Sequence, residues 1–138
     1  MIRAVLDTNI VISALVFRGE ASVLVPAWQG ARFRMLVSSH LLDEYIRVLH
    51  YPKFHLTPAE VHHLIITEVV PFVTPVKVVR VPRVIRVDPS DNHVLACASS
   101  GKADVIVSGD HHLLALERYG RIPILTLNAF LHRLGFPG

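Results

Sequence analysis

Four acidic residues stand out in a chain that otherwise consists mainly of apolar strand and helix patterns: Asp7, Glu44, Asp91 and Asp110. Asp7 directly follows the mostly apolar run 2–6, and Asp110 comes soon after the apolar run 105–107. Carboxylates that a fold brings together repel one another and resist desolvation, so they require compensation. A hard divalent cation with oxygen ligands is the usual compensation. This set of residues therefore points to metal-assisted chemistry on phosphates.

Each acid also has a purely structural explanation. Asp7 and Asp110 each stand where they can cap a following helix. In the segment Asp88-Pro89-Ser90-Asp91, Asp88 can be the N-cap and Asp91 the third helical residue, where a negative charge favours the helix dipole. No single acid decides between structure and chemistry, but the set of four favours chemistry.

Helical periodicity separates Glu44 from its neighbour Asp43. The apolar stripe of this segment consists of Leu41, Leu42, Tyr45, Val48 and Leu49. At 100° per residue, Glu44 lies roughly 110° from the centre of the stripe and Asp43 roughly 150°. We therefore expect Asp43 to face water and Glu44 to flank the buried face, either as an ordinary boundary charge or as a site residue.

Composition favours one domain over residues 1–138. The chain is 51% hydrophobic with a mean hydropathy of +0.45, as expected for strands that are covered on both faces. No apolar run reaches the roughly 18 residues that indicate a membrane span. The single cysteine, Cys97, excludes an internal disulfide framework and is compatible with a reducing cytoplasm. We expect Cys97 to be a packing residue in a cytoplasmic protein.

Basic residues recur at every third position through the segment 75–87: Lys77, Arg80, Arg83 and Arg86. The whole chain has a net charge of +3 and a pI near 9.4, which mildly favours a polyanionic partner. One interpretation is a solvated edge strand protected by charge and by Pro82. The other is a rim that tracks phosphates beside the acids.

Strand and helix patterns alternate along the chain. The expected strands or extended segments are 2–6, 33–37, 76–87, 105–107 and 123–126. The expected helices are 10–17, 21–29, one from Ser38 or Ser39 to about 50, 57–70, 88–101, 111–118 and 128–134. Such alternation predicts a parallel, doubly wound sheet. Ligands of such sheets bind beyond the carboxyl ends of the strands, where Asp7 and Asp110 are expected.

Four segments resemble, in order, the four motifs of PIN-domain nucleases: 5–11, 43–49, 88–98 and 101–110. Asp7, Glu44, Asp91 and Asp110 match the acids of these motifs. The resemblance implies an α/β fold, a three-layer α/β/α sandwich with a central, mostly parallel sheet. It also implies that these acids hold Mg²⁺ or Mn²⁺.

The resemblance further implies an endoribonuclease whose products carry 5′-phosphate and 3′-hydroxyl ends. Asn9 and Ser108 match polar positions that support the acids, and Asp88 is able to share or take the role of Asp91. The motifs are also similar to those of bacterial and archaeal PIN proteins to which the toxin role of toxin–antitoxin pairs is assigned. An RNA substrate, an antitoxin protein and a homodimer are the partners that this likeness implies.

Two other functions stay open. The chain can be a catalytically idle domain that binds RNA or a partner. It can be a phosphatase or phosphotransfer domain with Asp7 as nucleophile, although Asp7-Thr8-Asn9 lacks the second acid of the Asp-x-Asp pattern. A structural zinc site is disfavoured, because two histidine pairs are adjacent, at 62–63 and 111–112, and lack the i, i+4 spacing of helical ligands.

Overall fold

The computed structural model describes residues 1–85 and 88–137. Within these residues, six strands form one sheet in the order β3-β2-β1-β4-β6-β5. The strands are β1 (Arg3–Leu6), β2 (Arg34–Ser38), β3 (Val73–Val76), β4 (Val105–Val107), β5 (Arg118–Tyr119) and β6 (Ile122–Leu125). All neighbouring strands are parallel except β5 and β6. The predicted mostly parallel α/β fold is confirmed.

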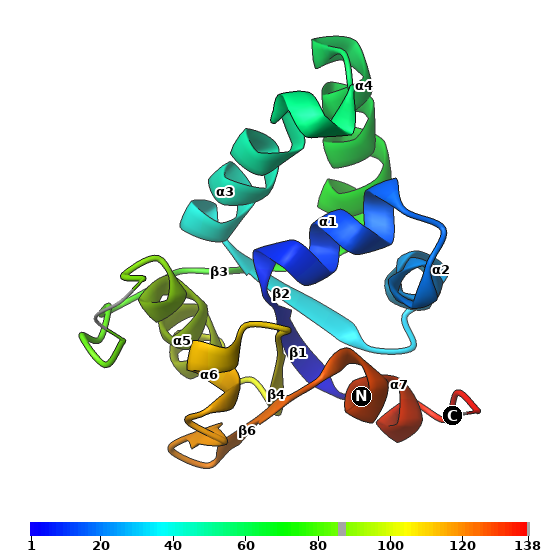
Figure 1. Cartoon of the computed structure of the whole chain (residues 1–138). Coiled ribbons are helices and arrows are strands. Elements are labelled where there is room, and N and C mark those ends of the chain that lie inside the picture. Colours follow the sequence, from blue (N-terminus) through cyan, green and yellow to red (C-terminus); the bar gives the residue numbers. More distant parts are fainter. Residues whose placement is uncertain (86–87, 138) are drawn as a thin grey trace.

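Helices cover both faces of the sheet, so that the described residues form three layers (Figure 1). They are α1 (Thr8–Val16), α2 (Leu24–Gln29), α3 (Ser39–Leu49), α4 (Pro58–His63), α5 (Asp91–Ser100), α6 (His111–Leu114) and α7 (Leu127–Arg133). Figure 1 shows α5 on one side of the sheet and α1, α2 and α7 on the other. Short 3₁₀ helices lie at Glu20–Val23, Pro52–Phe54 and Val70–Phe72, and a π-helix lies at Leu64–Val69.

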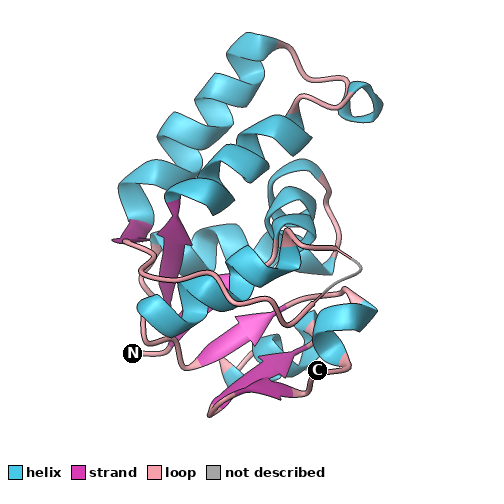
Figure 2. Ribbon diagram, turned by 90° about the vertical axis from the view of Figure 1, so that its left-hand side faces the viewer, coloured by secondary structure: helices cyan, strands magenta, loops and turns pink. Residues whose placement is uncertain are grey.

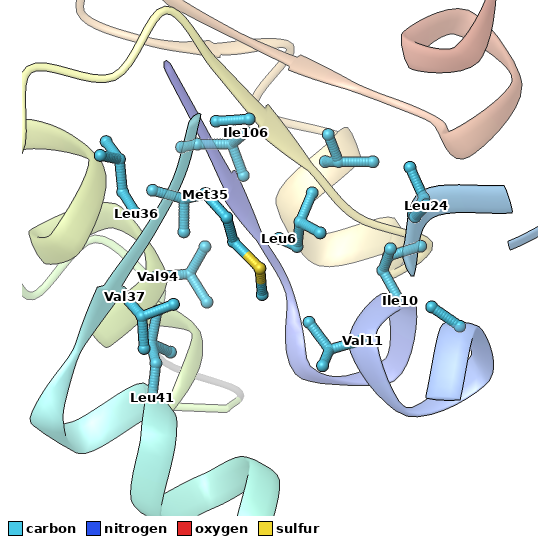
Figure 3. Close-up of a cluster of buried hydrophobic side chains, with 14 of the residues drawn as sticks. Leu6, Ile10, Val11, Leu24, Met35, Leu36, Val37, Leu41, Val94 and Ile106 are labelled. Carbon is cyan, nitrogen blue, oxygen red and sulfur yellow. The ribbon is translucent and has the colours of Figure 1, made fainter. Parts of the chain in front are cut away.

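The core lies on both sides of the central strands, because their apolar runs have no polar face. Leu6 of β1, Met35 of β2 and Ile106 of β4 are all fully buried. Val94 of α5 and Val11 of α1 contribute to the same core (Figure 3). Each of β1 and β4 ends just before a predicted site residue, Asp7 after β1 and Ser108 after β4.

The helix predicted at 57–70 has a different form. Thr57 caps it as expected, and its side chain and that of Glu60 form a capping box. The α-helical part ends at His63, and a π-helix and a 3₁₀ turn follow. Pro71 explains the change, because a proline ring clashes with the carbonyl four residues earlier and wider turns relieve that contact. Together with α3, this irregular helix forms an arm that projects beyond the sheet (Figures 1 and 2).

Two other predicted elements differ from the structure. The extended segment 76–87 is paired only at its start, because β3 ends at Val76; residues 77–85 form no strand, and the rest of the prediction lies outside the described residues. The helix predicted at 111–118 ends at Leu114, because Glu117 adopts a left-handed φ of 61° and the chain turns into the β5–β6 hairpin. Gly120, with a φ of 60°, begins the two-residue turn of that hairpin.

In the described part of the chain, no single helix is long and apolar enough to cross a membrane. The segments Thr8–Val16 and Glu20–Gln29 reach the required length and composition only when taken together, and they are bent by 88°.

Candidate metal centre

Asp7 lies at the carboxyl end of the central strand β1 and caps α1. Its Oδ1 accepts a hydrogen bond from the backbone N–H of Thr8, at 2.8 Å. Its Oδ2 accepts a second bond from the hydroxyl of Ser108, also at 2.8 Å. The side chain is 6% exposed. Asp7 therefore has its predicted structural role as a cap and also lies where the sheet places ligands.

Ser108 connects the ends of β1 and β4. Its hydroxyl donates to Asp7 and accepts a hydrogen bond from the backbone N–H of Asp110 at 2.9 Å. Asp110 caps α6, because its Oδ1 accepts from the backbone N–H of His112 at 2.7 Å. The structure thus brings Asp7, Ser108 and Asp110 together at neighbouring strand ends, as predicted from the topology.

The beginning of α5 adds two further acids. The carboxylate of Asp88 accepts hydrogen bonds from the backbone and hydroxyl of Ser90, so it caps the turn that precedes the helix. The helix itself begins at Asp91, so Asp91 is its first residue, where the sequence placed it third. Oxygens of Asp88, Asp91 and Asp110 lie within 4.8 Å of one another. Among the described residues, no cluster this compact includes Asp7 or Glu44.

Glu44 lies on helix α3. Its side chain is 14% exposed, whereas Asp43 is exposed, as the helical periodicity predicts. The adjacent Tyr45 is fully buried, and its hydroxyl donates to the backbone carbonyl of Leu6 at 2.8 Å. This bond ties the helix that carries Glu44 to the strand that leads into Asp7. The helical pattern predicted only an apolar packing role for Tyr45.

The acids act on one another electrostatically. Burial raises the pKa of Asp91 to about 7, and repulsion from Asp110, Asp7, Asp88 and Glu44 adds to the rise. Burial also raises the pKa of Asp7, with the charges of Glu44 and Asp110 as smaller causes, while the bonds from Ser108 and Thr8 oppose the change. Glu44 and Asp7 therefore belong to the same electrostatic site as the compact cluster.

These residues fit a hard divalent cation. The donor set consists of carboxylate oxygens, which Mg²⁺ and Mn²⁺ prefer. Oδ2 of Asp91 is completely buried and accepts no hydrogen bond from the described residues. A buried carboxylate oxygen without a donor is costly, and a cation removes that cost. Asp88, Asp91 and Asp110 are the residues that could hold such an ion most closely, with Asp7 and Glu44 beside them.

Asn92 holds the basic segment in place, and this role was not predicted. Its Oδ1 accepts hydrogen bonds from the backbone N–H groups of Val84 and Ile85, at 3.1 and 2.8 Å. Its Nδ2 donates to the carbonyl of Ile85 at 2.7 Å. Asn92 directly follows Asp91, so one turn of α5 carries both a site acid and the anchor of the segment.

The remaining predicted site residues lie on the surface. Lys77, Arg80 and Arg83 are exposed in the segment without regular structure that follows β3. Arg86 lies outside the described residues. Asn9 is exposed on the first turn of α1 and lines a shallow pocket of about 270 Å³ with Phe17 and Phe54. No side-chain hydrogen bond links Asn9 to an acid in the part of the chain that the structure describes, and its supporting role stays a prediction.

Two histidine pairs lie next to the acids. His111 and His112 follow Asp110, and ligand atoms of the three residues lie within 4.8 Å of one another. The rings of His40 and His93 stack with centroids 3.4 Å apart and an angle of 9° between their planes. Burial, and then the charge of His40, lowers the pKa of His93. The sequence carried no signal for the His40–His93 pair, because its members lie on different helices.

Comparison with known families agrees with this site. The family model described as PIN domain matches residues 3–112, from β1 to the start of α6, and this range includes all four acids. No curated protein matches the sequence significantly. PIN domains are generally metal-dependent nucleases. The match covers most of the chain and every acid of the site, and on this basis the protein belongs to the PIN-domain family.

Proposed function

We propose that this protein is a metal-dependent endoribonuclease that hydrolyses phosphodiester bonds of RNA. The observation that carries the proposal is the carboxylate of Asp91, which is 5% exposed, has a pKa of about 7 and keeps one oxygen without a hydrogen-bond donor. Asp88 and Asp110 lie beside it. Burying carboxylates next to one another destabilises the folded state, and a bound cation removes that destabilisation. Membership of the PIN family adds the expectation of nuclease chemistry.

Asp7, Glu44, Asp91 and Asp110 are the proposed metal ligands, and Asp88 is proposed to share the position of Asp91. When bound, Mg²⁺ or Mn²⁺ neutralises the carboxylates, draws charge from the phosphate and makes a water molecule more acidic. The protein supplies rigid positions for these groups. The Ser108 hydroxyl fixes one oxygen of Asp7, as expected for a supporting residue.

Cleavage of a labelled RNA pool by the pure protein tests this proposal. The arms contain Mg²⁺, Mn²⁺ or EDTA, and DNA of the same sequences is a parallel substrate. Asp7→Asn and Glu44→Gln should abolish cleavage, whereas Asp43→Asn should retain it. The last two variants form a matched pair, because both remove one charge from neighbouring positions of α3 and only Glu44 faces the site. Circular dichroism checks that each variant is folded.

The alternatives give other results. A catalytically idle domain binds RNA but shows no metal-dependent turnover under any of these conditions. Cleavage that persists in Glu44→Gln protein refutes the proposed role of that acid. An aspartyl-phosphate mechanism at Asp7 is disfavoured, because both oxygens of Asp7 already accept hydrogen bonds and the side chain is almost completely buried. Trapping of Asp7 with a phosphate-mimicking fluoride would restore that alternative.

We also propose that the protein is the cytoplasmic toxin of a toxin–antitoxin pair and that it forms a homodimer. The motif order supports the toxin role, and exposed apolar side chains such as Phe17, Ile66 and Phe72 offer surface for a second copy or an antitoxin. Induced expression should arrest bacterial growth, and Glu44→Gln should not. Light scattering after size-exclusion chromatography measures the oligomeric state. Normal growth at full expression of the wild-type protein would contradict the toxin role.

A further inference from the structure

A groove of about 770 Å³ lies beside the acids. One wall consists of the end of β2 and the first turn of α3, and the other consists of residues between Val70 and Val81. His40 and His93 belong to its lining. Most of the remaining lining side chains are apolar, including Val73, Val76 and Val81. The groove is therefore large enough, and apolar enough, to take a flat organic ring.

The stacked histidines connect this groove to the acids. Nε2 of His40 lies 3.9 Å from Oε2 of Glu44, one helical turn along α3. His93 follows Asp91 by two positions on α5. The two rings are nearly parallel, at an angle of 9°. The pair therefore lies next to Glu44 and, along α5, close to Asp91, while it also lines the groove.

The charge at the groove is suited to an anion. Lys77 belongs to the lining, and no carboxylate does among the described residues. The exposed Arg80 and Arg83 continue along the segment that forms the same wall. A polynucleotide combines the two features that the groove accommodates, since its phosphates are anionic and its bases are flat rings that stack on aromatic side chains, including histidine. An acidic peptide would match only the positive charge of the groove and would offer no flat ring for its apolar part.

We propose that this groove is a nucleobase subsite, in which the nucleotide adjoining the cleaved phosphodiester stacks its base against the His40–His93 pair and places a phosphate near Lys77. This inference rests on the proposed ribonuclease function and adds a specificity-determining element to it. A base can enter the groove only when it is unpaired, so the RNA must be single-stranded at this nucleotide. The pair then selects for unpaired sequence next to the cleavage position.

Binding of a fluorescent single-stranded oligoribonucleotide in EDTA tests the subsite without cleavage. His40→Ala and His93→Ala should weaken binding by about five- to a hundred-fold, the range for loss of one base–aromatic stack. His93→Phe should restore most of the affinity. His62→Ala is the matched control, because His62 is an exposed histidine on α4, at the far end of the molecule from α5 and α6 (Figure 1).

A second substrate separates stacking from a general effect on the fold. Each oligonucleotide in a series lacks the base at a different position, and the wild-type protein should bind one of them more weakly than the intact RNA. The His93→Ala variant should bind that abasic oligonucleotide and the intact RNA with the same, weak affinity. Equal affinity of wild type, His40→Ala and His93→Ala for intact RNA overturns the subsite, while metal-dependent cleavage still supports the ribonuclease. In that case the groove serves another occupant, such as an antitoxin peptide. Loss of binding in both alanine variants without any cleavage supports the subsite and refutes the nuclease.

Discussion

Replacing Asp91 by asparagine keeps the shape of the side chain, removes its charge and so isolates the cost of that charge. The folded protein holds the pKa of Asp91 at about 7, chiefly through burial and then through repulsion from Asp110, whereas the ordinary value is 3.8. Folding therefore takes up a proton between these two pH values. The unfolding free energy falls as the pH rises through this window, because the folded state holds the proton that the unfolded state has lost.

The magnitude follows from the two pKa values. A pKa difference of one corresponds to about 1.4 kcal/mol, so the ionised Asp91 lowers the unfolding free energy at pH 8 by at most about 4 kcal/mol. Part of this cost is already present at pH 5, because the unfolded carboxyl is ionised there. The stability advantage of Asp91→Asn should therefore grow by about 2–3 kcal/mol between pH 5 and pH 8.

Urea unfolding of the wild type and Asp91→Asn in EDTA at both pH values measures this advantage. The difference between the two proteins at each pH cancels the contributions of histidines that they share. Added Mg²⁺ should raise the midpoint of the wild type more than that of the variant, because a ligand of the folded state stabilises it by mass action. Asp43→Asn serves as the exposed control. A variant that is no more stable than the wild type at pH 8 would refute the reasoning.

Three further predictions concern the scaffold. Gly101→Ala should lower the unfolding free energy by about 1–3 kcal/mol, because the new Cβ would lie 2.8 Å from Cγ2 of Val76; an unchanged urea midpoint would contradict it. Asn92→Ala should speed amide hydrogen exchange at residues 84–85, whose backbone groups it releases, and unchanged exchange there would show that other contacts hold the segment. The Cys97 thiol is buried and burial raises its pKa to about 11, so iodoacetamide at pH 8 should label it only after unfolding in urea; rapid labelling of the native protein would contradict its burial.

The sheet was predictable because its central strands are buried on both faces. This burial requires short, continuous apolar runs, and such runs are visible at β1, β2 and β4. The elements that differ were decided by contacts outside their own segments. Glu117 takes a left-handed conformation, unusual for glutamate, because β5 pairs with β6. Local helix propensity does not predict the π-helix at Leu64–Val69, because that form depends on Pro71, which follows the segment.

The closeness of Asp7 and Asp110 could be predicted from their places after expected parallel strands, and the periodicity of α3 predicted the orientation of Glu44. Of the groups that position them, Ser108 was expected as a supporting residue, but its hydrogen bond to Asp7 and the bond from Tyr45 to Leu6 were not. Tyr45 and Leu6 are 39 positions apart, and Ser108 and Asp7 are 101 positions apart. A hydroxyl in an apolar stripe gives no sign of which carbonyl it will reach, because the partner is chosen by the packing of α3 against β1. The closeness of Asp88 to Asp91 and Asp110 likewise depends on how the turn before α5 folds.

The hydrogen bonds of Asn92 have a consequence for how this protein can change. They attach the segment before α5 through main-chain groups alone. Its path is therefore largely independent of which exposed side chains it carries, among them Arg80, Arg83 and Val84. Substitutions at those positions can vary the surface next to the acids without moving the acids themselves. The Asn92 amide thus separates the exposed side chains of this segment from the acids, which makes the segment a suitable place to graft new sequence.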